Sequence, residues 1–392
     1  MLASTMARAD VVTDWNVKAG EIVVAAGLTT APANRTMAIV QTAVYEAVNA
    51  ITRRYPDNGL KLDAAPVASV EAAVAAANYA TLVKLLPSQQ AAVDNAYRAA
   101  LSKIAGGPVK AAGIAVGEKA AAAILALRGD DGADAIETYR PYTAAGVYVP
   151  TVIPVVPQWP QRKPWLMTSP AQFRPGAPPK LTSELWARDY NETKSLGGKN
   201  SARRTPEQTD IALFWVATLP PVYHGVVRSV ANMPGREITR NARFYAAVTQ
   251  AADDAVIAVM DAKYHYNFWR PITAIRNGDL DSNDATERDP SWTPLIETPM
   301  HPEYPCAHCI ASSVVGAVVQ AEIGAGPTPT LTTTSHISGA TRSWTKIEDF
   351  IQEVADARIY AGVHYRNSKD VGVEMGKQIG ELAAAKFLRP VN

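Results

Sequence analysis

The first 130 or so residues carry the feature that most constrains the fold, a dense recurrence of alanine, valine, leucine and glutamate at helical spacing. Alanine is the strongest helix former, and its small side chain lets neighbouring helices pack closely. Helical spacing returns in the second half of the chain, and no segment sustains the alternation of a half-buried strand. We therefore predict an all-α protein with helices over 35–51, 67–86, 88–104, 109–128, 238–269, 307–323 and 344–387.

Residues 137–179 separate the two helical regions and contain ten prolines together with five tyrosines and tryptophans. Proline lacks the backbone donor that a helix needs, so this stretch is expected to be a long ordered loop that shapes the entrance of a pocket. We divide the chain into an N-terminal bundle over 1–136, the proline-rich loop over 137–179, and a C-terminal bundle over 180–392. The three parts are expected to form one compact unit.

Charged residues are few and balanced, so the 392 residues carry a formal net charge of only +1. A nucleic-acid-binding protein normally has a basic excess, and so does a protein that is drawn to an anionic membrane surface. No apolar run approaches the length of a membrane-spanning helix. Composition thus argues against nucleic acid and membrane partners and leaves small molecules, among them an anion held by a local cluster of cations. It leaves a homo-oligomer open.

The start of the sequence contains Ala7-Arg8-Ala9 before Asp10, which is similar to the small-x-small end of a cleaved signal peptide. One interpretation is a periplasmic or secreted protein whose signal peptide is missing from this sequence. The other is a chance match, and the sequence leaves both open.

Lys263 and Arg270 are the first candidate site residues. Seven residues make two helical turns, so on a continuous helix the two cations lie on nearly the same face. Aromatic residues stand between them, and a proline follows Arg270 directly. Aromatic surroundings favour burial, and a buried cation needs an anion. Two solvated surface cations are the alternative.

His308 lies in the second group, in the string Pro-Cys-Ala-His-Cys over 305–309. A proline precedes an apolar helix whose N-terminus offers free backbone N–H groups and the positive end of the helix dipole to an anion. Two cysteines exclude a disulfide framework, and Cys306 is expected to be a thiol. A zinc site of Cys306, His308 and Cys309, with His301 as a further ligand, is the alternative, although three ligands within four residues are crowded.

Arg358 and His364 form the third group. Their six-residue separation places them about 120° apart on a straight helix, so the two side chains would not share a face. Gly362 stands between them and would have to end or bend the helix for both side chains to reach one point.

Taken in order, the three groups resemble the signature of the vanadium-dependent haloperoxidase and type 2 phosphatidic-acid-phosphatase superfamily. That signature is Lys-x6-Arg-Pro, then Pro-Ser-Gly-His, then Ser-Arg-x5-His. This chain has Lys263-x6-Arg270-Pro271, Pro305-Cys306-Ala307-His308 and Ala357-Arg358-x5-His364. Residues 35–51 and 361–380 are also similar to segments of bacterial haloperoxidase-like members. The resemblance implies two packed helical bundles of the superfamily's type, with an oxyanion site at the end of one bundle.

The resemblance also implies a role for each matched residue. Lys263, Arg270 and Arg358 would hold the oxygens of vanadate as the cofactor, and phosphate would fit the same site. His364 would bond to the central atom, as the vanadate ligand of a peroxidase or the nucleophile of a phosphatase. His308 would be the general acid–base. Hydrogen peroxide, a halide and an organic acceptor would be the small-molecule partners.

Three positions depart from the family pattern, with Cys306 and Ala357 in place of serines and Ala307 in place of glycine. We still expect Cys306 and Ala307 to bind the oxyanion, because a thiol remains a weak donor and alanine keeps its backbone N–H. If His301 aligns with the histidine of bromoperoxidase-type members, bromide or iodide is favoured over chloride, since chloroperoxidase-type members carry phenylalanine there.

Three functions stay open at this point. A vanadate-dependent haloperoxidase is favoured, because simple phosphatases of the superfamily are often shorter and the opening helix is similar to that of haloperoxidase-like members. A phosphate-ester hydrolase with His364 as nucleophile and His308 as general acid is the alternative. The third is an oxyanion-binding protein, or an acid–base enzyme that works without vanadium.

Overall fold

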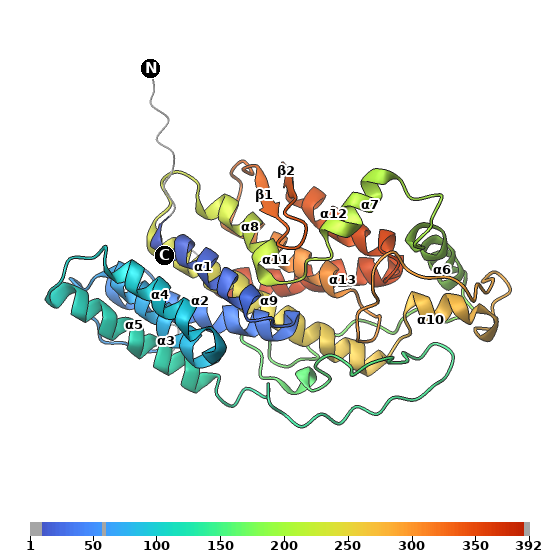
Figure 1. Ribbon diagram of the computed structural model, residues 1–392, viewed down its shortest axis with the longest axis horizontal. Helices are drawn as coiled ribbons and strands as arrows, with labels where there is room; N and C mark the ends of the chain where they lie inside the picture. The colour runs from blue at the N-terminus through green and yellow to red at the C-terminus, as the bar shows by residue number, and fades with distance from the viewer. Residues whose placement is uncertain (1–9, 57–59, 388–392) are drawn as a thin grey trace, which may run out of the picture.

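A computed structural model describes residues 10–56 and 60–387, and the all-α prediction is confirmed (Figure 1). The signal-like motif at residues 7–9 lies outside the described residues. No helix in the described part is both long enough and apolar enough to cross a membrane. The elements are α1 (Val11–Ala25), α2 (Thr30–Thr52), α3 (Val70–Leu85), α4 (Gln90–Leu101), α5 (Pro108–Leu127), α6 (Glu184–Gly197), α7 (Pro206–Phe214), α8 (Pro220–Ala231), α9 (Ile238–Tyr266), α10 (Pro271–Arg276), α11 (Ala307–Ile323), β1 (Leu331–Thr334), β2 (Thr341–Trp344), α12 (Ile347–Tyr360) and α13 (Arg366–Phe387), with short 3-10 turns η1 (Pro87–Gln89), η2 (Trp159–Gln161) and η3 (Gly278–Leu280).

Small residues set the spacing of the helices in both halves of the chain. Gly117 of α5 lies so close to α3 that a Cβ there would stand 2.3 Å from the carbonyl oxygen of Ala73. The same arrangement joins α13 to α11, because a Cβ at Gly376 would stand 2.3 Å from the carbonyl oxygen of Ile310. Such close packing resists small displacements, so it fixes the position of α11, whose first turn carries His308.

The long helix α9 connects the two groups of helices, because it packs against α2 on one side and against α11 and α13 on the other (Figure 1). Glu237 caps its N-terminus by accepting hydrogen bonds from the amides of the first turn. Asn267 ends it by taking a left-handed conformation with φ 49°. Since α9 contacts both groups, the division of the chain at residues 136 and 179 stays a prediction.

The proline-rich segment 137–179 is mostly irregular and follows the course of α9 (Figure 1). Carboxylates of α9 bind its backbone and side chains. Asp254 accepts hydrogen bonds from the three successive amides of residues 165–167 at 2.7, 2.8 and 2.9 Å. Arg174 donates to both carboxylate oxygens of Asp261 at 2.7 Å. These contacts satisfy backbone groups that proline-rich sequence cannot satisfy within itself, so the segment is an ordered part of the fold.

Several helices, among them α1, α6 and α10, and one hairpin were not among the predicted elements. The sequence of α6 is polar, and the helix forms because Ser183 caps it and because Trp186 and Tyr190 are buried in an aromatic cluster. The hairpin pairs β1 with β2 antiparallel, from Leu331 opposite Trp344 to Thr334 opposite Thr341. The predicted helical start at residue 344 was therefore wrong, since Trp344 ends β2. Helix α1 was overlooked at the start of the chain.

Candidate oxyanion site

Lys263 occupies the last turn of α9 and is fully buried. Its ammonium donates to the carbonyl oxygens of Pro302 and Glu303 at 3.0 and 2.7 Å. The prediction that Arg270 shares this helix face was wrong, because α9 ends at Tyr266 and Arg270 is the residue before α10. The left-handed turn after α9 redirects the chain, and Arg270 reaches the same region from a different element.

The guanidinium of Arg270 joins two loops. Its Nε donates to the carbonyl oxygen of His301 at 2.9 Å, and its Nη1 donates to that of Val363 at 2.8 Å. It also faces Nδ1 of His301 at 2.9 Å and Nε2 of His364 at 3.2 Å. An arginine only donates hydrogen bonds, so Nε2 of His364 must present a lone pair. Nδ1 of His301 also lies 3.1 Å from the carbonyl oxygen of Pro302, which only accepts, so its role depends on the tautomer of the ring.

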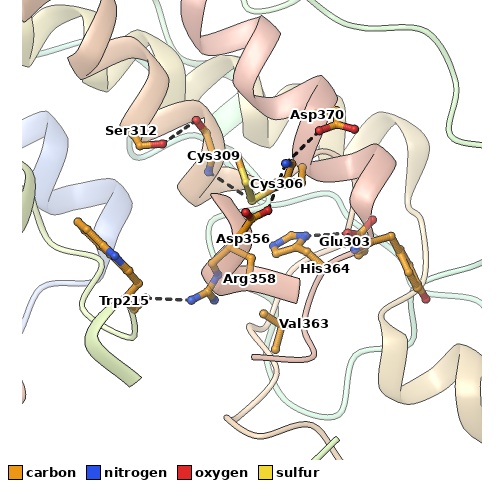
Figure 2. Close-up of a disulfide and its surroundings, with 12 residues drawn as sticks. Trp215, Glu303, Cys306, Cys309, Ser312, Asp356, Arg358, Val363, His364 and Asp370 are labelled. Atoms are coloured by element: carbon orange, nitrogen blue, oxygen red, sulfur yellow. Dashed lines mark hydrogen bonds and ion pairs between the residues drawn. A yellow bond between two sulfur atoms is a disulfide. The ribbon is translucent and has the colours of Figure 1, made fainter. Parts of the chain in front are cut away.

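His364 lies in the turn between α12 and α13, and the predicted break at Gly362 is found there. α12 ends at Tyr360, and Gly362 takes φ 76°, a left-handed conformation that favours glycine. Arg358 remains in the last turn of α12, where its Nη1 donates to the carbonyl oxygen of Trp215 at 2.9 Å (Figure 2). The turn brings His364 beside Arg358 although a straight helix would keep the two side chains apart.

Glu303 is a site residue that the sequence reasoning missed. Its Oε1 lies 2.6 Å from Nδ1 of His364 and also accepts the amide of Tyr365 at 3.2 Å (Figure 2). Burial raises the pKa of Glu303 to about 7, against the pull of Lys263 and Arg270. A glutamate within the aromatic and proline-rich string at 301–305 was the available signal, because few charged residues tolerate such surroundings.

The first turn of α11 differs from the expectation at the cysteines. Cys306 caps the helix and forms a disulfide with Cys309, with the two Cα atoms 5.4 Å apart (Figure 2). A cap and the third residue of the helix lie on the same side of the first turn, which brings the two sulfurs together. The expected Cys306 thiol donor was therefore wrong, because a disulfide carries no proton. The zinc alternative fails as well, since paired cysteines offer no thiolate.

A cavity of about 480 Å³ ends at these residues. His301, Ala307, His308, Arg358 and His364 line that end of it. Lys263 and Arg270 lie buried directly behind, where they hold the loops that carry His301 and His364. Cys306 and Ala357 are buried away from the lining, and the disulfide packs against Ala355 and Val373.

The site concentrates positive charge without matching carboxylates. Within the part of the chain that the structure describes, no ion pair joins Lys263, Arg270 or Arg358 to an acidic residue, and each is at most 1% exposed. Burial lowers the pKa of Lys263 well below its usual range and that of each arginine to about 10. An anion placed among these groups would supply the missing countercharge.

Both catalytic candidates are buried histidines with a depressed pKa. Burial is the largest cause for each, followed by Arg358 for His308 and Arg270 for His364. Nε2 of His308 and Nε of Arg358 are buried without a hydrogen-bond partner in the described residues. Buried polar atoms are seldom left unpaired, so the two atoms indicate a polar ligand at this end of the cavity.

Sequence comparison places the C-terminal bundle in a known family. Residues 243–392 match the family model described as the VCPO second helical-bundle domain. Vanadium chloroperoxidase from Curvularia inaequalis is 28% identical over 155 residues, which cover 32% of this chain. The match spans only 25% of that protein's length.

Structural comparison extends the likeness to nearly the whole chain. A crystal structure described as the first bacterial vanadium-dependent iodoperoxidase superposes with a TM-score of 0.81 at 23% identity, covering 95% of each chain. A holo-type bacterial vanadium-dependent chloroperoxidase gives 0.70 at 17% identity, covering 94% of this chain and 92% of that one. At these identities the superpositions show the fold alone. The chain therefore has the fold of the vanadium-dependent haloperoxidases, and its C-terminal bundle is related to theirs in sequence as well.

Proposed function

We propose that the protein is a vanadate-dependent haloperoxidase that oxidises bromide or iodide with hydrogen peroxide, with vanadate bonded to His364. One observation carries the proposal. His364 donates from Nδ1 to Glu303 and presents the lone pair of Nε2 toward Arg270, at the cationic end of the cavity. A neutral imidazole with an oriented lone pair is what coordination of a metal centre requires, and Arg270 holds that lone pair in place at 3.2 Å.

The residues present fit vanadate. Three buried cations lack carboxylate partners among the described residues, and unpaired atoms of His308 and Arg358 face the same region. Lys263, Arg270 and Arg358 would hold its oxygens by charge-assisted hydrogen bonds, and the Ala307 amide at the start of α11 would add a backbone donor. Bound vanadate supplies a Lewis-acidic centre that activates peroxide toward a halide.

The remaining tasks belong to side chains of this protein. His308 is neutral at pH 7 because its pKa is depressed, so its Nε2 takes the proton that hydrogen peroxide releases and returns it to the departing oxygen. Glu303 keeps His364 in the required tautomer. Two positions at which the family pattern has serine supply no side-chain donor here, because Cys306 is in a disulfide and Ala357 has no hydroxyl. The turn at 306–309 therefore offers the oxyanion its backbone N–H groups. Oxyanion affinity is therefore expected to rest on charge more than on hydroxyl contacts.

His301 carries the halide part of the proposal. It lines the cavity beside His364, and Arg270 holds its ring through Nδ1. The halide preference rests on the family resemblance, in which bromoperoxidase-type members carry histidine near this position and chloroperoxidase-type members carry phenylalanine, so bromide and iodide are favoured over chloride.

The test is bromination and iodination of a dye by purified protein with hydrogen peroxide, with and without orthovanadate. We expect turnover only with vanadate, and its loss in His364→Ala. His265→Ala is the matched control, because His265 is exposed at the end of α9 and away from the cavity. Full activity in His364→Ala would exclude the assignment. Vanadate-inhibited hydrolysis of phosphate esters, without any peroxide-dependent turnover, would replace it with the phosphatase function.

A further inference from the structure

The cavity that ends at His308 has two contrasting parts. Its inner end is the cationic site, while most of the remaining wall is aliphatic. On α11, Ala307, Ala311 and Val315 follow one another at four-residue steps and all line the cavity. Val256 and Val259 of α9 form the facing wall. Eight residues of helix extend about 12 Å, so the apolar wall runs roughly that far from the site.

Three polar side chains deep within the apolar part, Thr30, Thr218 and His224, already have partners in the protein. Thr30 donates to Thr218 through their hydroxyls at 2.7 Å. His224 lies 3.1 Å from the Asn16 amide through its Nδ1, and burial lowers its pKa to about 3, which keeps the ring neutral. Nε2 of His308, by contrast, has no hydrogen-bond partner among the described residues. The unpaired polar atoms of His308 and Arg358 thus lie at the inner end of the cavity, and most of the wall beyond them offers apolar contact.

The mouth of the cavity combines aliphatic side chains with two exposed polar residues, Glu297 and His336. Ile337, in the turn between β1 and β2, lines the cavity and is 59% exposed. Leu28, just before α2, lines the same region. Exposed aliphatic side chains at a pocket entrance are typical of sites that admit apolar ligands.

We propose that this cavity binds the organic acceptor itself, an apolar molecule with an alkyl or alkyl-aromatic body whose reacting end lies at His308 and His364. The inference rests on the proposed haloperoxidase function and names the substrate class. In the overall reaction the halide is oxidised and forms the carbon–halogen bond, and the acceptor loses the hydrogen of the replaced carbon–hydrogen bond. Peroxide takes up one further proton and is reduced to two waters. Halogen transfer inside the cavity then selects among acceptors by their apolar size.

The test is a competition between 4-methylphenol and 4-pentylphenol at equal concentration, with bromide, peroxide and vanadate-loaded protein. We expect preference for the pentyl compound by about tenfold or more, because each buried methylene favours binding by up to about fourfold. Free hypobromite, as the reference reagent, lacks a binding site and should show little preference. Equal products from the enzyme and from hypobromite would overturn the proposal.

Substitutions in the cavity wall test whether the preference for 4-pentylphenol arises there. Ala311→Phe fills the wall one turn from His308 and should abolish the preference for 4-pentylphenol, and Val256→Phe does the same from α9 if the first variant fails to fold. Ala122→Phe, on the exposed face of α5, is the matched control and should leave the preference unchanged. A preference that survives both cavity variants would place acceptor binding elsewhere and overturn the proposal.

A binding measurement separates this failure from failure of the proposed function. Calorimetric titration compares vanadate, methylphosphonate and pentylphosphonate with the unmodified protein. Vanadate-dependent bromination without size selection overturns the acceptor proposal and leaves the haloperoxidase function standing. Pentylphosphonate binding together with hydrolysis of pentyl phosphate, and no bromination, overturns both and assigns the apolar wall to a phosphate ester.

Discussion

Nδ1 of His364 lies 2.6 Å from Oε1 of Glu303, and both side chains are at most 1% exposed. This contact decides which ring nitrogen carries the proton, so Nε2 is left with its lone pair toward the cationic end of the cavity. The carboxylate thereby controls the chemistry of a histidine that is 61 residues away in the chain.

Replacing Glu303 is expected to weaken vanadate binding through His364. Glu303→Ala should lower the affinity by about 10- to 100-fold, as for other residues that orient a metal-ligating histidine. Glu303→Gln should lower the vanadate affinity less, since its amide oxygen still accepts a hydrogen bond from Nδ1 of His364. Titration with vanadate measures both, with Glu297→Ala at the exposed cavity mouth as the control. Equal affinities in all three variants would mean that Glu303 does not orient the ring.

Lys263 should couple protein stability to the anion. Phosphate or vanadate is expected to raise the thermal unfolding midpoint of the unmodified protein, because only the folded state brings the three cations together. Lys263→Met and Arg358→Ala should each lower the binding free energy by about 2–5 kcal/mol and remove most of this rise. Scanning calorimetry with and without the anion tests this. An undiminished rise in both variants would place the anion elsewhere.

Stability should fall as the pH decreases from about 7 to 5.5. Burial strongly lowers the pKa of four histidines, so they are neutral when folded and take up protons when unfolded near pH 6.5. Each contributes stability above that pH and loses about 1.4 kcal/mol per unit of acidification below it. Glu303 and Asp254, with pKa values raised to about 7 and 6, act in the opposite sense. The four histidines together outweigh the two carboxyl groups, so the free energy of unfolding falls on acidification.

The pH prediction is checked by unfolding midpoints across this range, with His308→Gln expected to show a shallower dependence because one of the four titrating groups is removed. A midpoint that rises on acidification would show that the buried carboxyl groups dominate instead.

Asp254 should anchor the proline-rich segment. Asp254→Ala leaves three backbone amides without their acceptor, so we expect a loss of about 2–4 kcal/mol in the free energy of unfolding. Asp130→Ala is the matched control, since the Asp130 side chain is fully exposed and its ion pair with Lys163 lies at the surface. Chemical denaturation of the two variants measures the free energy of unfolding of each. Similar stabilities would contradict the anchoring role.

Local sequence signals were enough for most of the long helices and for several site residues. Gly362 was named as the residue that would have to end or bend the helix, and it does so by taking the left-handed conformation that glycine accepts best. The common location of Lys263 and Arg270 was predicted for the wrong reason. Periodicity cannot show that Asn267 ends α9, since asparagine in a left-handed cap and asparagine within a helix look the same in a sequence.

Contacts between distant segments could not be predicted. Glu303 acts through a residue in another turn, and no spacing rule connects the two. The disulfide joins residues that are three apart, yet its formation depends on how Cys306 caps α11. The apolar wall of the cavity combines side chains from α9 and α11 with those of loops, and each of these appears in the sequence as ordinary core.

The Cys306–Cys309 bond gives the first turn of α11 a chemical durability that a free cysteine would lack. Sulfur beside a peroxide-handling site is exposed to stepwise oxidation, in which a thiolate becomes a sulfenic acid and then an irreversible sulfinic acid. A sulfur that is already bonded to its neighbour has no thiolate from which that sequence begins. Under the proposed peroxidase function, the second cysteine would therefore act as a built-in protecting group for the first and keep the turn intact over many catalytic cycles.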